Sequence, residues 1–272
     1  MAESGSPQIP KKPGSVHSNA RTLLVAFAVC LVCSLLVASA VVLLKPIHLA
    51  NQHIERQRII VEIAGLMKPD LTVAQAYRQI DVAMIELSSG RAVDTLDPEN
   101  FDIAKAAKDE QLSEPLPRSA DPAQIRRKPR YLPVYRVNDD GGRLETLILP
   151  VYGYGLWSTL YGYIALRDDL RTIRGIRFYQ HAETPGLGGE VDNPRWLDLW
   201  EGKIAFDEHG EPRIELVKGA VTSATPDSQH KVDGLSGATL TSRGVTQLLN
   251  FWLGREGFGP YLTRLRDESE RR

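Results

Sequence analysis

Residues 233–242 read Asp-Gly-Leu-Ser-Gly-Ala-Thr-Leu-Thr-Ser and place two glycines, an alanine and four hydroxyl side chains directly before a helical pattern. Ser242 is a suitable N-cap for that helix, and Gly254 a suitable end. Apolar residues recur between them at helical spacing, at Val245, Leu248, Leu249 and Trp252. Small residues let a backbone approach a bulky group, and free N–H groups at a helix start suit a phosphate. The stretch therefore predicts either a loop that presents an anion or a nucleotide phosphate to a helix N-terminus, or a plain surface turn before a capped helix.

The run Ser-Gly-Ala-Thr at 236–239 resembles the flavinylation motif of proteins that carry flavin mononucleotide (FMN) on a threonine through a phosphoester. In that family the acceptor is the threonine that closes the run, which here is Thr239. The resemblance implies a covalently held redox flavin and a separate flavin transferase that makes the bond. The residues that it assigns to the phosphate end are Ser236, Gly237, Ala238, Thr239, Thr241 and Ser242.

The composition limits the classes of function. A chain of 272 residues allows one or two domains, and a formal net charge of −1 gives no indication of a nucleic-acid partner. The 22 glycines and the 7% aromatic content are typical of a loop-rich α+β domain rather than a helical bundle. Cys30 and Cys33 share one apolar run, so they cannot form a disulfide within a folded domain.

The N-terminal part predicts a membrane anchor. Residues 1–21 are polar and rich in Ser, Pro and Lys, and we expect a disordered tail there. The run from Thr22 to Leu44 carries no charge and exceeds the roughly 20 residues that a membrane-spanning helix needs. Ala38-Ser39-Ala40 looks like a signal-peptide cleavage site, but the apolar run continues beyond it. An uncleaved transmembrane helix over 22–44 is therefore the expectation.

The charges that flank the apolar run do not orient it. The basic residues nearest to it are Lys11, Lys12 and Arg21 before it and Lys45, Arg56 and Arg58 after it. An orientation by the positive-inside rule requires an excess on one side. Charge alone therefore leaves the side open.

Residues 45–130 are expected to form a stalk helix and a peripheral segment of the domain that follows the membrane helix. The expected elements are helices over Pro46–Met67, Val73–Ile80 and Phe101–Glu110 and a strand over Val82–Leu87. Residues 88–130 mix acidic, proline and basic residues, so we expect them to run over the surface. The cluster Arg126-Arg127-Lys128 is then a solvated face.

Residues 131–266 carry the pattern of the domain core, and residues 267–272 form a charged tail. Strands are predicted over Tyr131–Val137, Leu144–Leu149, Tyr161–Leu166, Thr172–Tyr179 and Arg213–Val217. An Asp-Asp-Gly-Gly turn at 139–142 joins the first two as a hairpin. Short helices are expected over Pro194–Trp200 and Phe258–Arg266. This order indicates an α+β fold, a twisted antiparallel sheet with packed helices.

A second motif, His-Ala-Glu-Thr-Pro-Gly-Leu-Gly-Gly-Glu at 181–190, follows directly after a predicted strand. Its proline and glycines predict a shaped loop that exposes backbone N–H groups beside a planar ligand. We expect Thr184 and the backbone from Gly186 to Gly188 to donate hydrogen bonds to the flavin ring. Leu187 would cover one ring face, and an ionised Glu183 would disfavour the anionic reduced flavin. The alternative is a tight turn with solvated side chains, and a metal site is not indicated.

Both motifs together resemble the family of the C subunits of the sodium-translocating NADH:quinone reductase (Na⁺-NQR). The segments Leu31-Val32-Cys33-Ser34 and Gly155–Tyr163 also look like that family. The resemblance runs from the membrane helix to the helix after Thr239. It implies an exported FMN domain on the periplasmic side of the bacterial inner membrane, held by one helix, with residues 1–21 as a cytoplasmic tail.

The resemblance also implies the setting of the flavin. It implies a six-subunit complex that oxidises NADH, reduces ubiquinone and exports Na⁺. The flavin would relay electrons between an iron–sulfur centre, held by the D and E membrane subunits, and a second threonine-linked FMN on the B membrane subunit. The NADH, quinone and ion sites would lie in other subunits, so no catalytic residue is expected in this chain.

Two alternatives remain at this point. The G subunit of an Rnf-type electron transport complex shares the flavin motif and the Pro-Gly-Leu-Gly loop. The Trp-Ser-Thr segment at 157–159 and the continuation after Gly188 favour the sodium-translocating family. A membrane-anchored envelope binding module without flavin would require both motifs to be coincidental turns.

Overall fold

The computed structural model describes residues 19–271. The chain divides into two units, with the boundary between His53 and Ile54. The first eighteen residues of the expected disordered tail, 1–21, lie outside the described part. Residues 19–21 are helical, because the first helix begins at Asn19.

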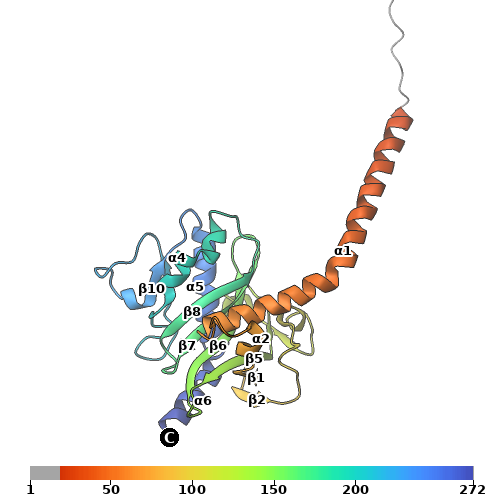
Figure 1. Cartoon of the computed structure of the whole chain (residues 1–272). Helices are drawn as coiled ribbons and strands as arrows, with labels where there is room; N and C mark the ends of the chain where they lie inside the picture. The colour runs from red at the N-terminus through yellow and green to blue at the C-terminus, as the bar shows by residue number, and fades with distance from the viewer. Residues whose placement is uncertain (1–18, 272) are drawn as a thin grey trace, which may run out of the picture. The chain divides into compact units, whose positions relative to one another are not determined.

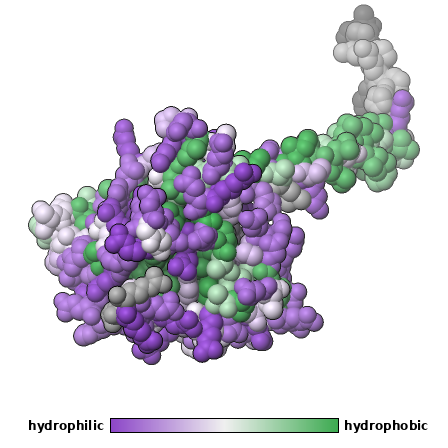
Figure 2. All heavy atoms as spheres, turned by 60° about the horizontal axis from the view of Figure 1, so that its bottom comes forward, coloured by the Kyte–Doolittle hydropathy of each residue, from purple (hydrophilic) through white to green (hydrophobic). Residues whose placement is uncertain are grey.

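The first unit consists of the apolar part of helix α1, Asn19–Ile63 (Figure 1). Its side chains from Ala20 to His48 are exposed, and most of them are apolar, as Figure 2 shows for one side of the helix. A long exposed helix that is apolar all round is typical of a membrane span. The helix is long and apolar enough to cross a membrane. Pro46 lies inside α1, so the expected anchor and stalk form one continuous helix.

The second unit is built on a six-stranded antiparallel sheet with the order β2-β1-β5-β6-β7-β8 (Figure 1). Its strands are β1 Ile80–Glu86, β2 Arg91–Val93, β5 Tyr131–Asn138, β6 Leu144–Tyr154, β7 Thr159–Arg167 and β8 Ile173–Gln180. The hairpin predicted at 139–142 joins β5 to β6. The antiparallel sheet with packed helices confirms the predicted α+β class.

The sheet is covered on both faces. On one face, the end of α1 and helix α2, Val73–Tyr77, form a small apolar core with the sheet. On the other face, the larger core includes helix α5, Thr239–Leu253, which runs along β6. The apolar α5 residues predicted from their spacing are all buried there: Val245, Leu248, Leu249 and Trp252. The buried face of α5 therefore fixes which of its residues turn outward.

Several elements differ in extent from the predicted ones. The remaining helices are α3 Ile103–Ala106, α4 Pro194–Leu197 and α6 Gly259–Glu270, and the 3₁₀ turns are η1 Arg118–Ala120, η2 Gly188–Asp192, η3 Asp198–Trp200 and η4 Ser228–His230. Helix α6 continues to Glu270, through most of the expected charged tail, in which Asp267 and Glu268 are exposed. The prediction of one helix over 73–80 is wrong at its end, since β1 already begins at Ile80.

The expectation that residues 88–130 only run over the surface is also wrong. Strands β3 Ser113–Pro115 and β4 Arg127–Pro129 pair with each other, and Ala123 is fully buried in the core. Lys128, expected in solvent, is 7% exposed and forms ion pairs with Glu114 (3.1 Å) and Glu256 (3.0 Å). Its partners compensate the charge, which is the condition for burying a lysine.

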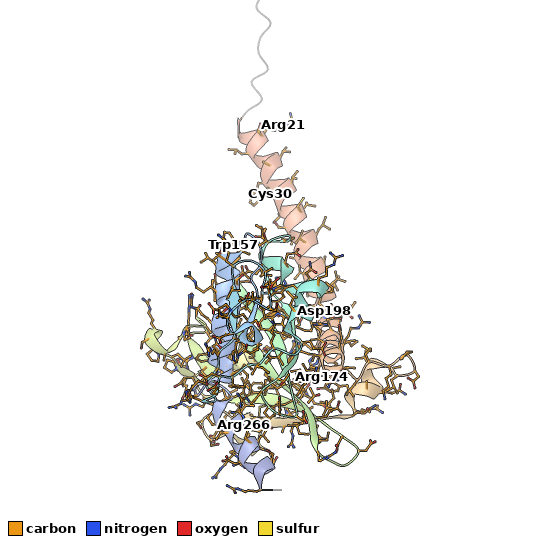
Figure 3. All side chains as sticks on the ribbon, turned by 90° about the vertical axis from the view of Figure 1, so that its left-hand side faces the viewer. Arg21, Cys30, Trp157, Arg174, Asp198 and Arg266 are labelled. Atoms are coloured by element: carbon orange, nitrogen blue, oxygen red, sulfur yellow. The ribbon has the colours of Figure 1, made fainter. Side chains whose placement is uncertain are left out.

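The packing of this unit predicts that two tryptophans contribute very differently to the free energy of unfolding. Trp252 is fully buried and donates a hydrogen bond to the Tyr152 carbonyl (2.5 Å), whereas Trp157 is 66% exposed at the end of the domain opposite Arg266 (Figure 3). Trp252→Ala should lower the free energy of unfolding by about 3–5 kcal/mol. Trp157→Ala should change it by no more than about 0.5 kcal/mol. Guanidinium unfolding of the full chain in detergent measures both, and equal losses would contradict this assignment of the core.

Candidate functional site

The acceptor loop, residues 233–238, leaves a short strand and enters α5. Strand β10, Lys231–Asp233, pairs in parallel with β9, Glu215–Val217. The Gly234 N–H then donates to the Val217 carbonyl (2.7 Å). A Cβ at position 234 would lie 2.6 Å from that oxygen, so only glycine allows this approach. The loop is therefore anchored to β9 before it turns to the helix.

The start of α5 lies earlier than predicted. Thr239 is its first residue and Ala238 its N-cap, so the prediction of Ser242 as N-cap is wrong. The Ser242 hydroxyl instead accepts a hydrogen bond from the Leu235 N–H (2.9 Å) and donates to the Ala238 carbonyl (3.1 Å). Ser242 thus fastens the acceptor loop to the first turn of the helix.

The residues of the predicted phosphate end do not share one environment. Ser236, Gly237 and Thr239 are exposed, and Gly237 has φ +70°, a conformation that favours glycine. Ala238 and Thr241 are buried. The Thr241 hydroxyl donates a hydrogen bond to a carboxylate oxygen of Glu183 (2.7 Å). Thr239 is the exposed threonine at the point where the helix begins.

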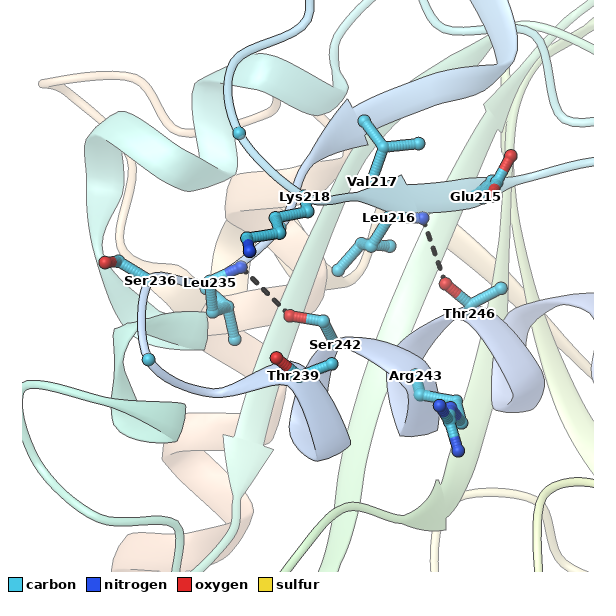
Figure 4. A pocket seen from close by; sticks show the side chains of 13 residues that line it. Glu215, Leu216, Val217, Lys218, Leu235, Ser236, Thr239, Ser242, Arg243 and Thr246 are labelled. Carbon is cyan, nitrogen blue, oxygen red and sulfur yellow. Dashed lines mark hydrogen bonds between the residues drawn. The ribbon is translucent and has the colours of Figure 1, made fainter.

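A cavity of about 540 Å³ lies beside Thr239, between α5 and β9 (Figure 4). It is lined by Glu215, Leu216, Val217, Lys218, Gly219, Gly234, Leu235, Ser236, Gly237, Thr239, Ser242, Arg243 and Thr246. Its volume is in the range of ligand sites, about 300–1,000 Å³. Three of the predicted site residues with a hydroxyl group, Ser236, Thr239 and Ser242, therefore line the same cavity.

The charge of this cavity suits a phosphate. Lys218 and Arg243 both line it, and neither forms an ion pair within residues 19–271. Figure 4 shows Lys218 next to β9 and Arg243 on α5, one turn after Thr239. The positive end of the α5 dipole adds to these two cations. The residues present thus fit a phosphate ester at Thr239.

The second motif lies against the start of α5, and Glu183 makes the connection. One oxygen of its carboxylate accepts hydrogen bonds from the N–H groups of residues 156, 157 and 158, at 3.0, 3.0 and 3.3 Å. The other accepts from the Thr241 hydroxyl. We call residues 155–158 the Trp turn and residues 181–190 the proline–glycine loop. A single buried carboxylate joins the Trp turn, the proline–glycine loop and α5.

These contacts also set the ionisation of Glu183. Burial acts to raise the pKa of its carboxyl group, but the hydrogen bonds from Thr241 and the three backbone N–H groups outweigh burial and hold the pKa below its ordinary value. Glu183 is therefore ionised at neutral pH. Its carboxylate accepts hydrogen bonds from the protein's own donors, and the predicted place of its charge beside the flavin ring stays a prediction.

The rest of the proline–glycine loop contacts the acceptor loop closely. Gly188 is buried, and a Cβ there would lie 2.6 Å from the Thr241 hydroxyl. A Cβ at Gly237 would lie 2.9 Å from a methyl group of Leu187, which is 44% exposed. Thr184 and Gly186 are exposed. The structure thus brings both motifs together, while the contact of this loop with a flavin ring stays a prediction.

Sequence reasoning missed the two cations of the cavity. Arg243 follows Thr239 by four residues, so the two lie on the same face of α5. This spacing could have identified Arg243 once the helix was predicted. Lys218 had no such signal, because only the pairing of β9 with β10 brings it to the cavity. Within the part of the chain that the structure describes, no cluster of side chains suited to a metal ion is present.

Comparison with known proteins identifies an FMN-binding domain in the part of the chain that holds both motifs. A family model described as FMN-binding domain matches residues 155–254, which include both motifs, the Trp turn and α5. The C subunit of the Na(+)-translocating NADH-quinone reductase of Pseudomonas aeruginosa is 51% identical over 92% of this chain and 97% of its own. The corresponding protein of Yersinia pestis is 45% identical over 94% of this chain and 96% of its own.

Among solved structures, the NqrC crystal structure from Shewanella oneidensis resembles this chain with a TM-score of 0.73 and 35% identity. The match covers 80% of this chain and 99% of that one. The C subunit of the reductase from Parabacteroides distasonis matches with a TM-score of 0.57 and 29% identity, over 78% of this chain and 93% of its own. These matches decide between the alternatives left by the sequence: the chain belongs to the family of C subunits of the Na(+)-translocating NADH-quinone reductase.

Proposed function

We propose that this chain carries FMN covalently, through a phosphoester to the Thr239 hydroxyl, and acts as an electron carrier in a membrane complex. The single observation that carries the proposal is the exposed Thr239 at the start of α5, beside a cavity that also holds Lys218 and Arg243. The FMN-binding domain match over the same residues supports it. The flavin supplies the redox chemistry when bound.

Different residues of this chain then have separate roles in holding the flavin. Lys218, Arg243 and the N-terminal dipole of α5 neutralise the phosphate. Ser242 keeps the acceptor loop in place, and Glu183 holds the Trp turn and the proline–glycine loop against the helix. A covalent link makes retention of the cofactor independent of affinity, which an electron carrier needs in every redox state.

The family supports a role within a larger assembly. We propose that the complex oxidises NADH, reduces ubiquinone and exports Na⁺. The relatives' name indicates an NADH-quinone reductase that translocates Na⁺. The immediate partners in this proposal are the B subunit, with its own threonine-linked FMN, and the D and E subunits, with an iron–sulfur centre. A flavin transferase acts once, during maturation.

We further propose that α1 anchors the chain in the bacterial inner membrane once, with the domain after it in the periplasm. The apolar, exposed segment of α1 supports the anchor. The family resemblance supports the side, because the flanking charges do not decide it.

The assignment of Thr239 as the acceptor predicts that one variant loses its covalent flavin. Thr239→Val removes the hydroxyl and nearly keeps the side-chain shape, so the chain expressed with its transferase should lose covalent flavin. Thr263→Val is the matched control, because it removes the hydroxyl of an exposed threonine on α6, outside the acceptor loop and the cavity. Flavin fluorescence in a denaturing gel reports both. A fluorescent band from Thr239→Val would refute the assignment.

The membrane arrangement predicts the behaviour of fusions after Arg272. A phosphatase reporter that is active only in the periplasm should be active there. A reporter that is active only in the cytoplasm should be inactive. The opposite pattern would contradict the proposed orientation, and a mature N-terminus at Val41 would show a cleaved signal peptide instead.

The role of Glu183 predicts a local effect on the Trp turn. Glu183→Ala removes the acceptor of three backbone N–H groups, so amide exchange at residues 156–158 should speed up and flavin incorporation should fall. Glu190→Ala is the control from the same loop, because the Glu190 side chain accepts a hydrogen bond from the Asn193 side chain (2.6 Å), whereas the N–H groups of the Trp turn donate to Glu183. Exchange at 156–158 that is equal in both variants would remove Glu183 from this role.

The same residue predicts a pH dependence. A carboxyl group with a lowered pKa stabilises the fold above its unfolded-state pKa, about 4.3, and this stabilisation is lost as the pH falls through the folded-state pKa. The glutamine side chain in Glu183→Gln does not ionise. Wild type should therefore unfold at a higher temperature than Glu183→Gln at neutral pH, and the difference should shrink in acid. A difference that is constant with pH would contradict the pKa direction.

A further inference from the structure

His181 is the first residue of the proline–glycine loop, directly after β8, and its side chain is only 13% exposed. Both nitrogens of its ring have a partner. Nε2 lies 2.7 Å from a carboxylate oxygen of Asp192 in η2, and Nδ1 accepts a hydrogen bond from the Glu183 N–H (3.2 Å). The imidazole therefore joins the backbone of Glu183 to η2.

These two bonds require one protonation state of the ring. Because the Glu183 N–H is a donor, Nδ1 must be free of a proton, and because the Asp192 carboxylate is an acceptor, Nε2 must carry one. This is a neutral imidazole. A cationic ring carries a proton on both nitrogens, so its Nδ1–H would face the Glu183 N–H and that bond would be lost. The bond to Asp192 would persist and gain the attraction of opposite charges.

The charged groups around the ring are acidic. Asp192 is in contact with it. Glu190, the other acid of η2, binds a side-chain amide at the end of that turn, and the Glu183 carboxylate binds the Trp turn and α5. The residues of the Trp turn carry no charge, and its Ser158 hydroxyl accepts a hydrogen bond from the N–H of residue 182 (2.7 Å). A proton on the ring therefore acts on Asp192 and on the Glu183 N–H.

The bond from the Glu183 N–H lies within the set of contacts that hold the loop on the Trp turn. The preceding N–H, of Ala182, donates to Ser158, and the Glu183 carboxylate accepts from the Trp turn and from Thr241. Because the carboxylate can reach these donors only from one position of its own backbone, the bond to His181 helps to set that position.

We propose that the neutral imidazole of His181 positions Glu183, and through it the Trp turn, and that protonation of His181 releases this part of the loop. Histidine side chains ordinarily change charge between pH 5 and 8. The loop should therefore be held most firmly at and above neutral pH and less firmly toward pH 5. The Glu183 carboxyl takes up its proton at lower pH, because its hydrogen bonds hold its pKa below the ordinary value.

Hydrogen exchange of the full chain in detergent, made without the transferase, tests this proposal at pH 7.5 and pH 5.5. Rates are corrected for the intrinsic pH dependence of amide exchange. In the wild type, residues 156–158 and the Glu183 amide should exchange roughly two- to tenfold faster at pH 5.5, the effect of losing one hydrogen bond. Equal corrected rates at both pH values would overturn the proposal.

Substitutions at position 181 separate the role of the acceptor from that of the ring. The side-chain oxygen of asparagine can accept from the N–H two residues on and never becomes cationic, so His181→Asn should exchange slowly at both pH values. His181→Leu offers no acceptor and should exchange fast at both. His209→Asn is the matched control, an exposed histidine in another turn, and should keep the pH response of the wild type. A pH response that survives in His181→Asn would overturn the proposal.

Asp192 supplies a test that a purely structural role of His181 would fail. Asp192→Asn removes the negative charge that favours the cationic ring, so the rise in exchange should move to lower pH. An unmoved rise would contradict the proposal.

The consequence for the cofactor rests on the proposed covalent flavin. In chain made with the transferase, the mass of the peptide with Thr239 should show less flavin in His181→Leu than in His181→Asn. Equal loading of the two variants would contradict a role of His181 in holding the flavin site. A wild-type chain without flavin on Thr239 would overturn the proposed function, whereas the exchange results would still decide the role of His181.

Discussion

The arrangement of the site depends on the buried carboxylate of Glu183. It accepts hydrogen bonds from three consecutive backbone N–H groups of the Trp turn and from the Thr241 hydroxyl in the first turn of α5. Three segments far apart in the sequence therefore meet at one charge. Because an unpaired buried carboxylate is costly, the folded chain keeps all four donors in place. The start of α5, and with it Thr239, is thereby fixed relative to the sheet.

Much of the fold was readable from local pattern. The helical spacing of the apolar residues from Val245 to Trp252 identified the buried face of α5. Apolar runs bounded by turn residues identified the central strands. Prediction was weaker where tertiary contacts override local pattern. Ser242 looked like an N-cap from its position, but its hydroxyl is occupied by Leu235 and the helix begins at Thr239. Lys128 looked solvated, yet two carboxylates allow its burial.

The candidate site was readable only in part. Motif letters led to Thr239 and to the proline–glycine loop, and the structure places the two motifs in contact. The same letters gave no indication of the cavity, because one of its walls is β9 and pairs with β10 only in the folded chain. Lys218 belongs to that wall. The position of Glu183 in the loop suggested a contact with the flavin ring. Its hydrogen bonds to the Trp turn and to Thr241 appear only in the folded chain.

The central claim is that Thr239, at the start of α5, carries the flavin through its phosphate beside Lys218 and Arg243. An experimental structure of the full chain, produced with its transferase, tests this most directly. We expect density continuous from the Thr239 hydroxyl into a phosphate beside Lys218 and Arg243. Density that leaves Thr239 unmodified, or a flavin joined to another residue, would contradict the claim.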